Sequence, residues 1–149
     1  MSDEPVRVLF VSTSNAARSI LAEAILRQVG AGRFEAMSAG IAPTAVHPLT
    51  RQVLGAAGFD HDWAVSRRVD DLLAERFDYV ITLCDDARLV CPVFPGADQS
   101  IHWGYKDPSA VDGDDATKLI AYERVFTDLA MRIRQFVVVA ERQQPIASA

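Results

Sequence analysis

Two runs of mainly apolar residues dominate the pattern of hydrophobic and polar positions. Val8 to Val11 and Asp78 to Cys84 are rich in β-branched and aromatic residues, as in strands that are buried on both faces. Small polar residues end the first run, and apolar residues at helical spacing then begin at Ile20 and stop before Gly30. The chain therefore opens with a predicted strand, a tight loop and a helix.

The remaining periodicity predicts shorter elements. Phe34 to Ala39 is typical of a second strand, and Pro48 opens a helix that ends at Gly58. Val65-Ser66 is a candidate short strand. Val69 to Glu75 is a candidate helix, because two aspartates fall in its first turn. Strands that alternate with helices in this way predict an α/β fold, a parallel sheet with helices on both faces.

The C-terminal half contains one long irregular stretch and one long helix. Asp85 to Asp115 has no sustained periodicity, so we expect a loop with a short strand near Ile101 to Trp103. A long amphipathic helix follows from Asp115, and the residues from Gln143 to Ala149 are expected to fray. The apolar face of this helix is predicted to hold Leu119, Tyr122, Phe126, Leu129, Ile133 and Phe136.

Composition limits the class of protein. The chain has 149 residues, half of them hydrophobic, which suits one domain (1-149) with its core at about 6-140. A net charge of -5 without a basic cluster argues against nucleic-acid binding. No apolar run approaches the roughly 20 residues of a membrane span, and the first residues are acidic, so we expect a cytoplasmic protein that does not bind a membrane.

The loop between the first strand and its helix is the candidate anion site. Small side chains let successive backbone N–H groups turn toward one point, and the helix N-terminus adds further unpaired donors. Arg18 adds a planar fork of donors that suits a tetrahedral oxyanion. The alternative is an ordinary turn with a solvated arginine. The predicted oxyanion-binding residues are Thr13, Ser14, Asn15, Ala16, Ala17, Arg18 and Ser19.

Two cysteines are the other candidates for chemistry. Cys84 ends a predicted strand, and ligands of parallel sheets lie beyond the carboxyl ends of the strands. Cys84 and the anion loop therefore point to one crevice. Cys91 follows after six residues of loop-like sequence, and two cysteines are too few for a disulfide scaffold. They are either a redox pair or two small buried hydrophobic residues.

Five short segments along the chain form one set of motifs. They are Ser12-x5-Arg18-Ser19, Ser38-Ala39-Gly40, Cys84-x6-Cys91-Pro92-x-Phe94-Pro95-Gly96, His102-Trp103 and Asp107-Pro108-x-Ala110-Val111-x-Gly113. Together they resemble the arsenate reductases that are built on the low-molecular-weight protein tyrosine phosphatase fold. The resemblance extends from Val6 to about Phe136 and implies a four-stranded parallel twisted sheet in a three-layer domain.

The resemblance implies a role for each motif in arsenate reduction. A cysteine at position 12 would attack arsenate, Arg18 would hold the oxyanion, Ser19 would donate a hydrogen bond to the thiolate, and Asp107 would protonate the departing oxygen. Cys84 would then attack the arsenylated sulfur and release arsenite. Its partner Cys91 would close a disulfide that thioredoxin reduces.

Residue 12 of this chain is serine. A hydroxyl is a poor nucleophile without an adjacent base. A serine oxygen also cannot form the disulfide through which a cysteine relay proceeds. We therefore predict that the chain binds arsenate, phosphate or sulfate and does not reduce arsenate. Ser12 is either an engineered trap or a natural inactive variant, and the sequence does not distinguish them. It also leaves the oligomeric state open.

Two other functions stay open. One is a phosphatase of the same fold, although Ser109-Ala110 follows Pro108 where those enzymes carry aromatic residues. The other is a non-enzymatic oxyanion-binding or regulatory protein, which Ser12 favours directly.

Some polar residues have less defined expectations. Asn15, Glu23, Ser38 and Asp70 fall where some relatives hold potassium, and an ordinary hydrogen-bond network is the alternative. His47 and His61 have no metal-ligand spacing between them. His102 and Trp103 are expected to pack at the edge of the sheet.

Overall fold

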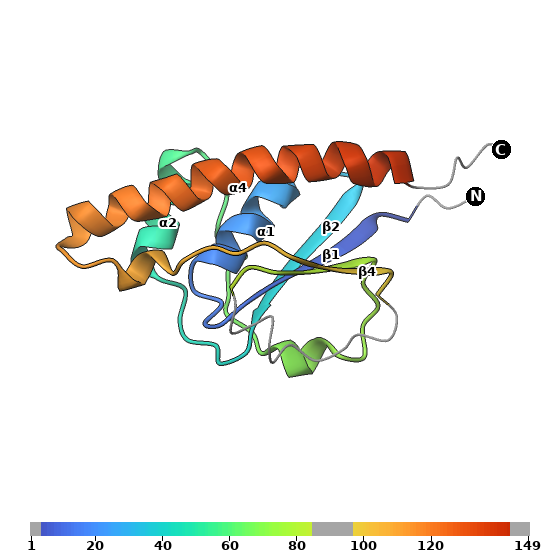
Figure 1. The fold of residues 1–149 in the computed structure, drawn as a ribbon, viewed down its shortest axis with the longest axis horizontal. Coiled ribbons are helices and arrows are strands. Elements are labelled where there is room, and N and C mark those ends of the chain that lie inside the picture. The colour runs from blue at the N-terminus through green and yellow to red at the C-terminus, as the bar shows by residue number, and fades with distance from the viewer. Residues whose placement is uncertain (1–3, 85–96, 144–149) are drawn as a thin grey trace.

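A four-stranded parallel sheet forms the centre of the molecule (Figure 1). The computed structural model describes residues 4–84 and 97–143. The strands are β1 (Val6–Ser12), β2 (Phe34–Gly40), β3 (Tyr79–Thr82) and β4 (Gln99–His102), in the spatial order β2-β1-β3-β4. Every neighbouring pair is parallel, which confirms the predicted α/β fold class.

Three helices cover one face of the sheet. They are α1 (Arg18–Val29), α2 (Pro48–Ala56) and α4 (Asp115–Gln143), and α4 runs along the length of the molecule across α1 and α2 (Figure 1). Val8 and Phe10 of β1 point into this side of the core. Leu9 and Val11 point to the opposite face, where Phe77 and the 3-10 helix η1 (Val69–Leu72) cover them. Alternate β1 residues thus enter two cores, as the uninterrupted apolar run predicts.

An aromatic cluster joins α4 to the sheet. The ring of Phe136 lies 6.1 Å from Phe34 of β2, 5.0 Å from Tyr79 of β3 and 5.9 Å from Trp103 after β4, measured between centroids. Offset and edge-on aromatic pairs at such distances add to the burial of the rings themselves. The C-terminal half of α4 is therefore anchored across the sheet, and the expectation that Trp103 packs at the sheet edge is confirmed.

Two predicted elements are wrong. Val65-Ser66 is not a strand, because only a bridge between Gly40 and Arg68 forms near it and Val65 is 50% exposed. The predicted helix from Val69 to Glu75 is only the four residues of η1. Its buried residues, Val69 and Leu72, are three apart, which matches the three residues per turn of a 3-10 helix and provides no apolar stripe for a longer α-helix.

Smaller differences concern element ends. The first helix begins at Arg18, two residues earlier than its apolar spacing indicates, and β4 begins at Gln99 and ends at His102. A second 3-10 turn, η2 (Pro108–Ala110), lies in the stretch expected to be loop. Among residues 4–84 and 97–143, no helix is long and apolar enough to cross a membrane.

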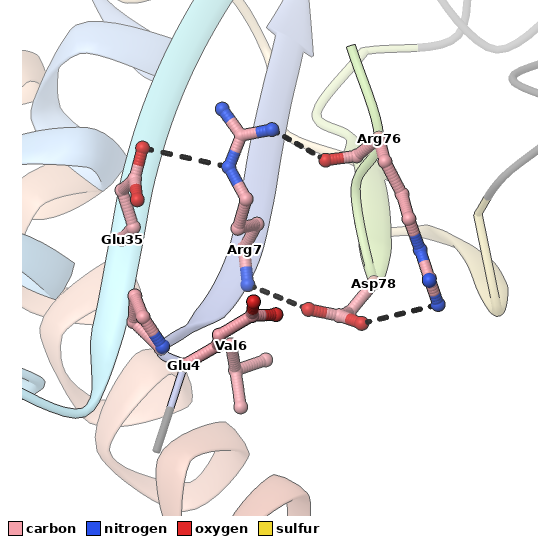
Figure 2. A pocket seen from close by; sticks show the side chains of 7 residues that line it. Glu4, Val6, Arg7, Glu35, Arg76 and Asp78 are labelled. Carbon is pink, nitrogen blue, oxygen red and sulfur yellow. Dashed lines mark hydrogen bonds and ion pairs between the residues drawn. The ribbon is translucent and has the colours of Figure 1, made fainter. Parts of the chain in front are cut away.

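The amino-terminal edge of the sheet carries a network of charged side chains (Figure 2). Arg7 of β1 contacts Glu35 of β2 (Nε to Oε1, 3.4 Å) and donates to the carbonyl of Arg76 (2.6 Å). Its backbone N–H donates to Asp78 (2.8 Å). These groups surround a hollow of about 500 Å³. Because these charged groups pair with one another, we interpret the network as a set of contacts that stabilises neighbouring strands rather than as a binding site.

Candidate functional site

The loop between β1 and α1 forms one wall of a small cavity at the carboxyl edge of the sheet. The cavity measures about 110 Å³, well above the roughly 10–15 Å³ that one water molecule needs, so it has room for a tetrahedral oxyanion. It brings together Ser12 and Arg18, which belong to one predicted motif, with Asp107, which belongs to another. Its lining comprises Ser12, Ser14, Ala16, Ala17, Arg18, Thr44, Ala45, His47, Asp107, Ser109 and Tyr122.

Backbone polarity in this loop favours an anion. The carbonyls of Thr13, Ser14 and Ala16 accept hydrogen bonds from the N–H groups of Ala42, Thr44 and His47, at 2.8–3.0 Å. Within the described part of the chain, no protein acceptor takes the N–H groups of residues 13–17. A turn with engaged carbonyls and unpaired amides is a concave array of donors. The predicted anion loop therefore has free donors available for a ligand.

Asn15 holds the loop in this shape. It is fully buried and has a φ of 48°, a left-handed conformation that asparagine tolerates better than most residues. Its Oδ1 accepts from the backbone N–H of Arg67 (2.9 Å), and this bond fixes which way the amide faces. Its Nδ2 then donates to Ser19 Oγ (2.8 Å) and Ser38 Oγ (3.0 Å).

The same bonds leave the Ser12 hydroxyl proton able to point into the cavity. Ser19 Oγ accepts from Asn15, so its own proton is free to donate to Ser12 Oγ, 2.7 Å away. With Ser12 accepting that bond, its own proton is free to point into the cavity. In this arrangement Ser12 can donate a hydrogen bond toward a bound anion. A nucleophile at this position would receive the same hydrogen bond from Ser19.

The buried carboxylate of Glu23 ends this network. It is 1% exposed and accepts from Ser38 Oγ (2.6 Å) and from Arg27 Nε (2.9 Å). Burial raises its pKa, and the bonds from Ser38 and Arg27 oppose that rise. The Arg27 guanidinium also forms an ion pair with Glu23 at 2.8 Å. An arginine thus already balances the charge of this carboxylate.

The predicted potassium residues are only partly brought together. Asn15, Glu23 and Ser38 form one cluster, whereas the exposed Asp70 has no hydrogen bond or ion pair to any of them within the described residues. That part of the structure also holds no metal-binding group of three or more His, Cys, Asp or Glu side chains. Oxygen ligands suit potassium, but Arg27 leaves little need for a second cation. Potassium binding stays a prediction.

Arg18 is held at the rim of the cavity. It is 6% exposed, so the alternative of a solvated arginine in an ordinary turn is not supported. Nη1 donates to the carbonyl of Tyr105 (3.0 Å), and Nη2 lies 3.8 Å from Asp107 Oδ2. Asp107 Oδ1 accepts from the N–H and hydroxyl of Ser109. Oδ2 is therefore the oxygen that faces the arginine.

Cys84 lies beside the anion loop, as its place at the end of β3 predicts. Its Sγ is 3.2 Å from Thr13 Oγ1, and the residue is 6% exposed. An adjoining hollow of about 510 Å³ is lined by Cys84 and Lys106 and shares Arg18 and Asp107 with the cavity. Cys91, with the Cys91 to Gly96 string, lies outside the described residues.

Sequence reasoning missed two side chains of the cavity, His47 and Tyr122. His47 Nδ1 accepts from the N–H of Leu49 (3.0 Å) and caps α2, and its ring lies 5.1 Å from that of Tyr122. The position of His47 directly before a helix-opening proline was an available signal. No signal was available for Tyr122, because its spacing along α4 is that of a core residue.

The other histidines have structural roles. His102 Nδ1 is 2.8 Å from Thr82 Oγ1, which confirms the expected packing at the sheet edge. His61 Nδ1 is 3.2 Å from Arg51 Nη1.

Comparison with known proteins points to one family. A family model described as low molecular weight phosphotyrosine protein phosphatase matches residues 7–145. The arsenate reductase of Halalkalibacterium halodurans is 32% identical and covers 87% of this chain and 93% of its own. The arsenate reductase of Bacillus licheniformis is 31% identical and covers 90% and 96%.

Solved structures agree with these sequence matches. An arsenate reductase in the phosphate binding state is 25% identical, with a TM-score of 0.77 over 89% of this chain and 97% of that one. A thioredoxin-dependent arsenate reductase of Corynebacterium glutamicum is 28% identical, with a TM-score of 0.72 over 97% of this chain and 66% of that one.

Proposed function

The chain belongs to the low molecular weight phosphotyrosine protein phosphatase family, and on that basis we propose that it binds arsenate or phosphate without reducing arsenate. The observation that carries the proposal is residue 12, a buried serine that ends β1 in the wall of the cavity. The arsenate reductases among its relatives suggest arsenate or phosphate as the ligand.

Binding is supported by the donors around the cavity. The unpaired amides of residues 13–17, the Ser12 hydroxyl and the Arg18 guanidinium can all donate to one tetrahedral anion. Charge-assisted hydrogen bonds of this kind are stronger than neutral ones. Because the net charge of the chain is -5, the attraction is confined to this local array of donors.

The proposed lack of turnover follows from the chemistry of oxygen. Reduction of arsenate to arsenite by thiols needs two electrons, and two sulfurs supply them by forming a disulfide. A cysteine at position 12 would carry the arsenic and Cys84 would then attack that sulfur. Ser12 cannot be attacked in this way, because an S–O bond is not the product of thiol–disulfide exchange.

The Ser12→Cys variant tests whether serine at position 12 is what prevents arsenate reduction. We expect thioredoxin-driven arsenate reduction in Ser12→Cys, none in the parent chain, and none in a Ser12→Cys variant that also carries Cys84→Ser. Turnover in the parent would disprove the proposed block. A folded Ser12→Cys variant without turnover would remove the link to arsenate reduction.

Anion titration tests binding by itself. Phosphate, arsenate and sulfate are titrated into the parent, into Arg18→Ala and into Arg134→Ala, which removes an exposed arginine of α4. We expect Arg18→Ala to weaken binding about tenfold or more, since a hydrogen bond to a charged group contributes about 1.5–3 kcal/mol. Arg134→Ala should match the parent. A parent that binds none of the three anions would refute the proposal.

A phosphatase function has less support. Ser109 lines the cavity directly after Pro108, so no aromatic side chain at that position can grip a phosphotyrosine ring. Phosphotyrosine hydrolysis by Ser12→Cys with both Cys84 and Cys91 replaced would favour it nonetheless.

A further inference from the structure

We propose that the hydroxyl of Tyr122 is a further anion-binding group, which donates a hydrogen bond to the oxyanion from the α4 side of the cavity. The inference rests on the proposed function, since it names an additional contact in the same site. Tyr122 comes from a different element than the loop that provides the other donors. It would therefore link the bound anion to the long helix.

Packing holds the tyrosine ring in a defined place. Tyr122 is fully buried, and it lines the 110 Å³ cavity together with Ser12, Arg18 and Asp107. Its ring packs against that of His47 at a centroid distance of 5.1 Å and an interplanar angle of 35°. His47 in turn is fixed by the bond that its Nδ1 accepts from the N–H of Leu49. The hydroxyl is thus held where it lies by a capped and stacked neighbour.

The hydroxyl itself is unsatisfied. Within the described residues, Tyr122 Oη is buried and makes no contact with the distance and angle of a hydrogen bond, although the Ser109 side chain lies near enough to lower the pKa of Tyr122. Buried polar groups are nearly always paired with protein or with ordered water, and a bound anion can take the place of such water. An unpaired donor beside unpaired loop amides and Arg18 indicates that the missing partner is an acceptor common to all of them. A tetrahedral oxyanion has four oxygens to share among such donors.

Protonation favours the same role. Burial raises the pKa of Tyr122 to about 12, and the charge of Asp107 adds to the rise, while Ser109 and Arg18 oppose it. The group is therefore a neutral donor near pH 7, where phosphate and arsenate are anions. It adds a hydrogen bond without adding a charge that would need its own counterion.

The Tyr122→Phe variant tests the inference, because it removes one oxygen atom and keeps the ring. We expect the Kd for inorganic phosphate, measured by isothermal titration, to rise about tenfold, the effect of one hydrogen bond to a charged group. The ligand-free variant should keep or raise its Tm, since the lost hydroxyl has no protein partner. If the hydroxyl had only a structural role, Tyr122→Phe would lower the Tm and leave the Kd for phosphate unchanged.

Tyr79→Phe is the matched control. It makes the same change at a buried tyrosine at the start of β3, which does not line the cavity. We expect its phosphate Kd to equal that of the parent.

Three results are decisive. A Tyr122→Phe Kd within twofold of the parent would overturn the inference and leave the proposed function intact. A parent that does not bind phosphate would remove both. A phosphate-bound crystal structure of the parent should place Oη within hydrogen-bond distance of a phosphate oxygen, and a bond to Ser109 or Asp107 in its place would also overturn the inference.

Discussion

Replacement of Asn15 by alanine is expected to destabilise the fold and open the anion loop. The change removes three buried hydrogen bonds, from Arg67 N–H to Oδ1 and from Nδ2 to Ser19 and Ser38. At about 1 kcal/mol for each bond, the loss is about 3 kcal/mol. Alanine at a φ of 48° costs about 1 kcal/mol more. The total of about 4 kcal/mol is a large part of the roughly 5–15 kcal/mol that stabilises a typical domain.

Urea denaturation of the parent, Asn15→Ala and Asn15→Gly measures both parts of this loss. Glycine accepts the left-handed backbone but makes none of the side-chain bonds, so its loss should be about 1 kcal/mol smaller than that of alanine. Both variants should also bind phosphate more weakly, because the loop amides lose their fixed direction. A loss below about 1 kcal/mol in both variants, against the 3 kcal/mol expected from three bonds, would refute the reasoning.

Three further predictions concern the surroundings of the loop. Gly40→Ala should cost about 1–3 kcal/mol and weaken phosphate binding, because a Cβ at Gly40 would lie 2.8 Å from the carbonyl oxygen of Thr13. In contrast, Gly55→Ala inside α2, where the nearest atom is 3.7 Å from the added Cβ, should add about 0.5–1 kcal/mol of stability; urea melts measure both, and a loss in both would contradict the packing argument. Glu23 has a pKa raised in the folded state, so its contribution to stability is present at low pH and lost as the pH rises through that pKa. Melts across pH should therefore show the parent losing stability relative to Glu23→Gln above the ordinary carboxyl range, and parallel curves would contradict this. Potassium should raise the Tm little in the parent but more in Arg27→Gln, where Glu23 has lost its paired charge; melts in KCl and NaCl of equal strength test this, and equal potassium effects in both would refute it.

The sequence was most informative where one pattern had one physical solution. An uninterrupted apolar run at β1 can only be buried on both sides, and its end at Ser12 therefore locates the anion loop and the crevice that Cys84 shares. The strand expected at Val65-Ser66 failed because two residues carry too little pattern to distinguish a strand from an extended connection. The helix expected over Val69 to Glu75 failed because acidic residues in a first turn do not supply an apolar stripe.

Tyr122 shows a different limit. Helical spacing predicts that a side chain points into the protein. It does not predict whether that side chain packs in the core or lines a cavity. The fully buried Tyr122 satisfies the same pattern as Leu129 and Ile133. Only the fold reveals that Tyr122 lines one cavity together with the loop residues Ser12 and Arg18.

Because α4 is long, anion binding at one end of the helix would be detectable at its other end. Its second turn places Tyr122 in the cavity wall, while Phe136, four turns further on, is clamped among rings from β2, β3 and the segment after β4. A continuous α-helix is stiff along its axis, so an anion that binds Tyr122 as proposed would restrict motion at the other end as well. If the proposed function holds, binding of arsenate or phosphate would then be detectable as slower amide exchange along the C-terminal half of the helix.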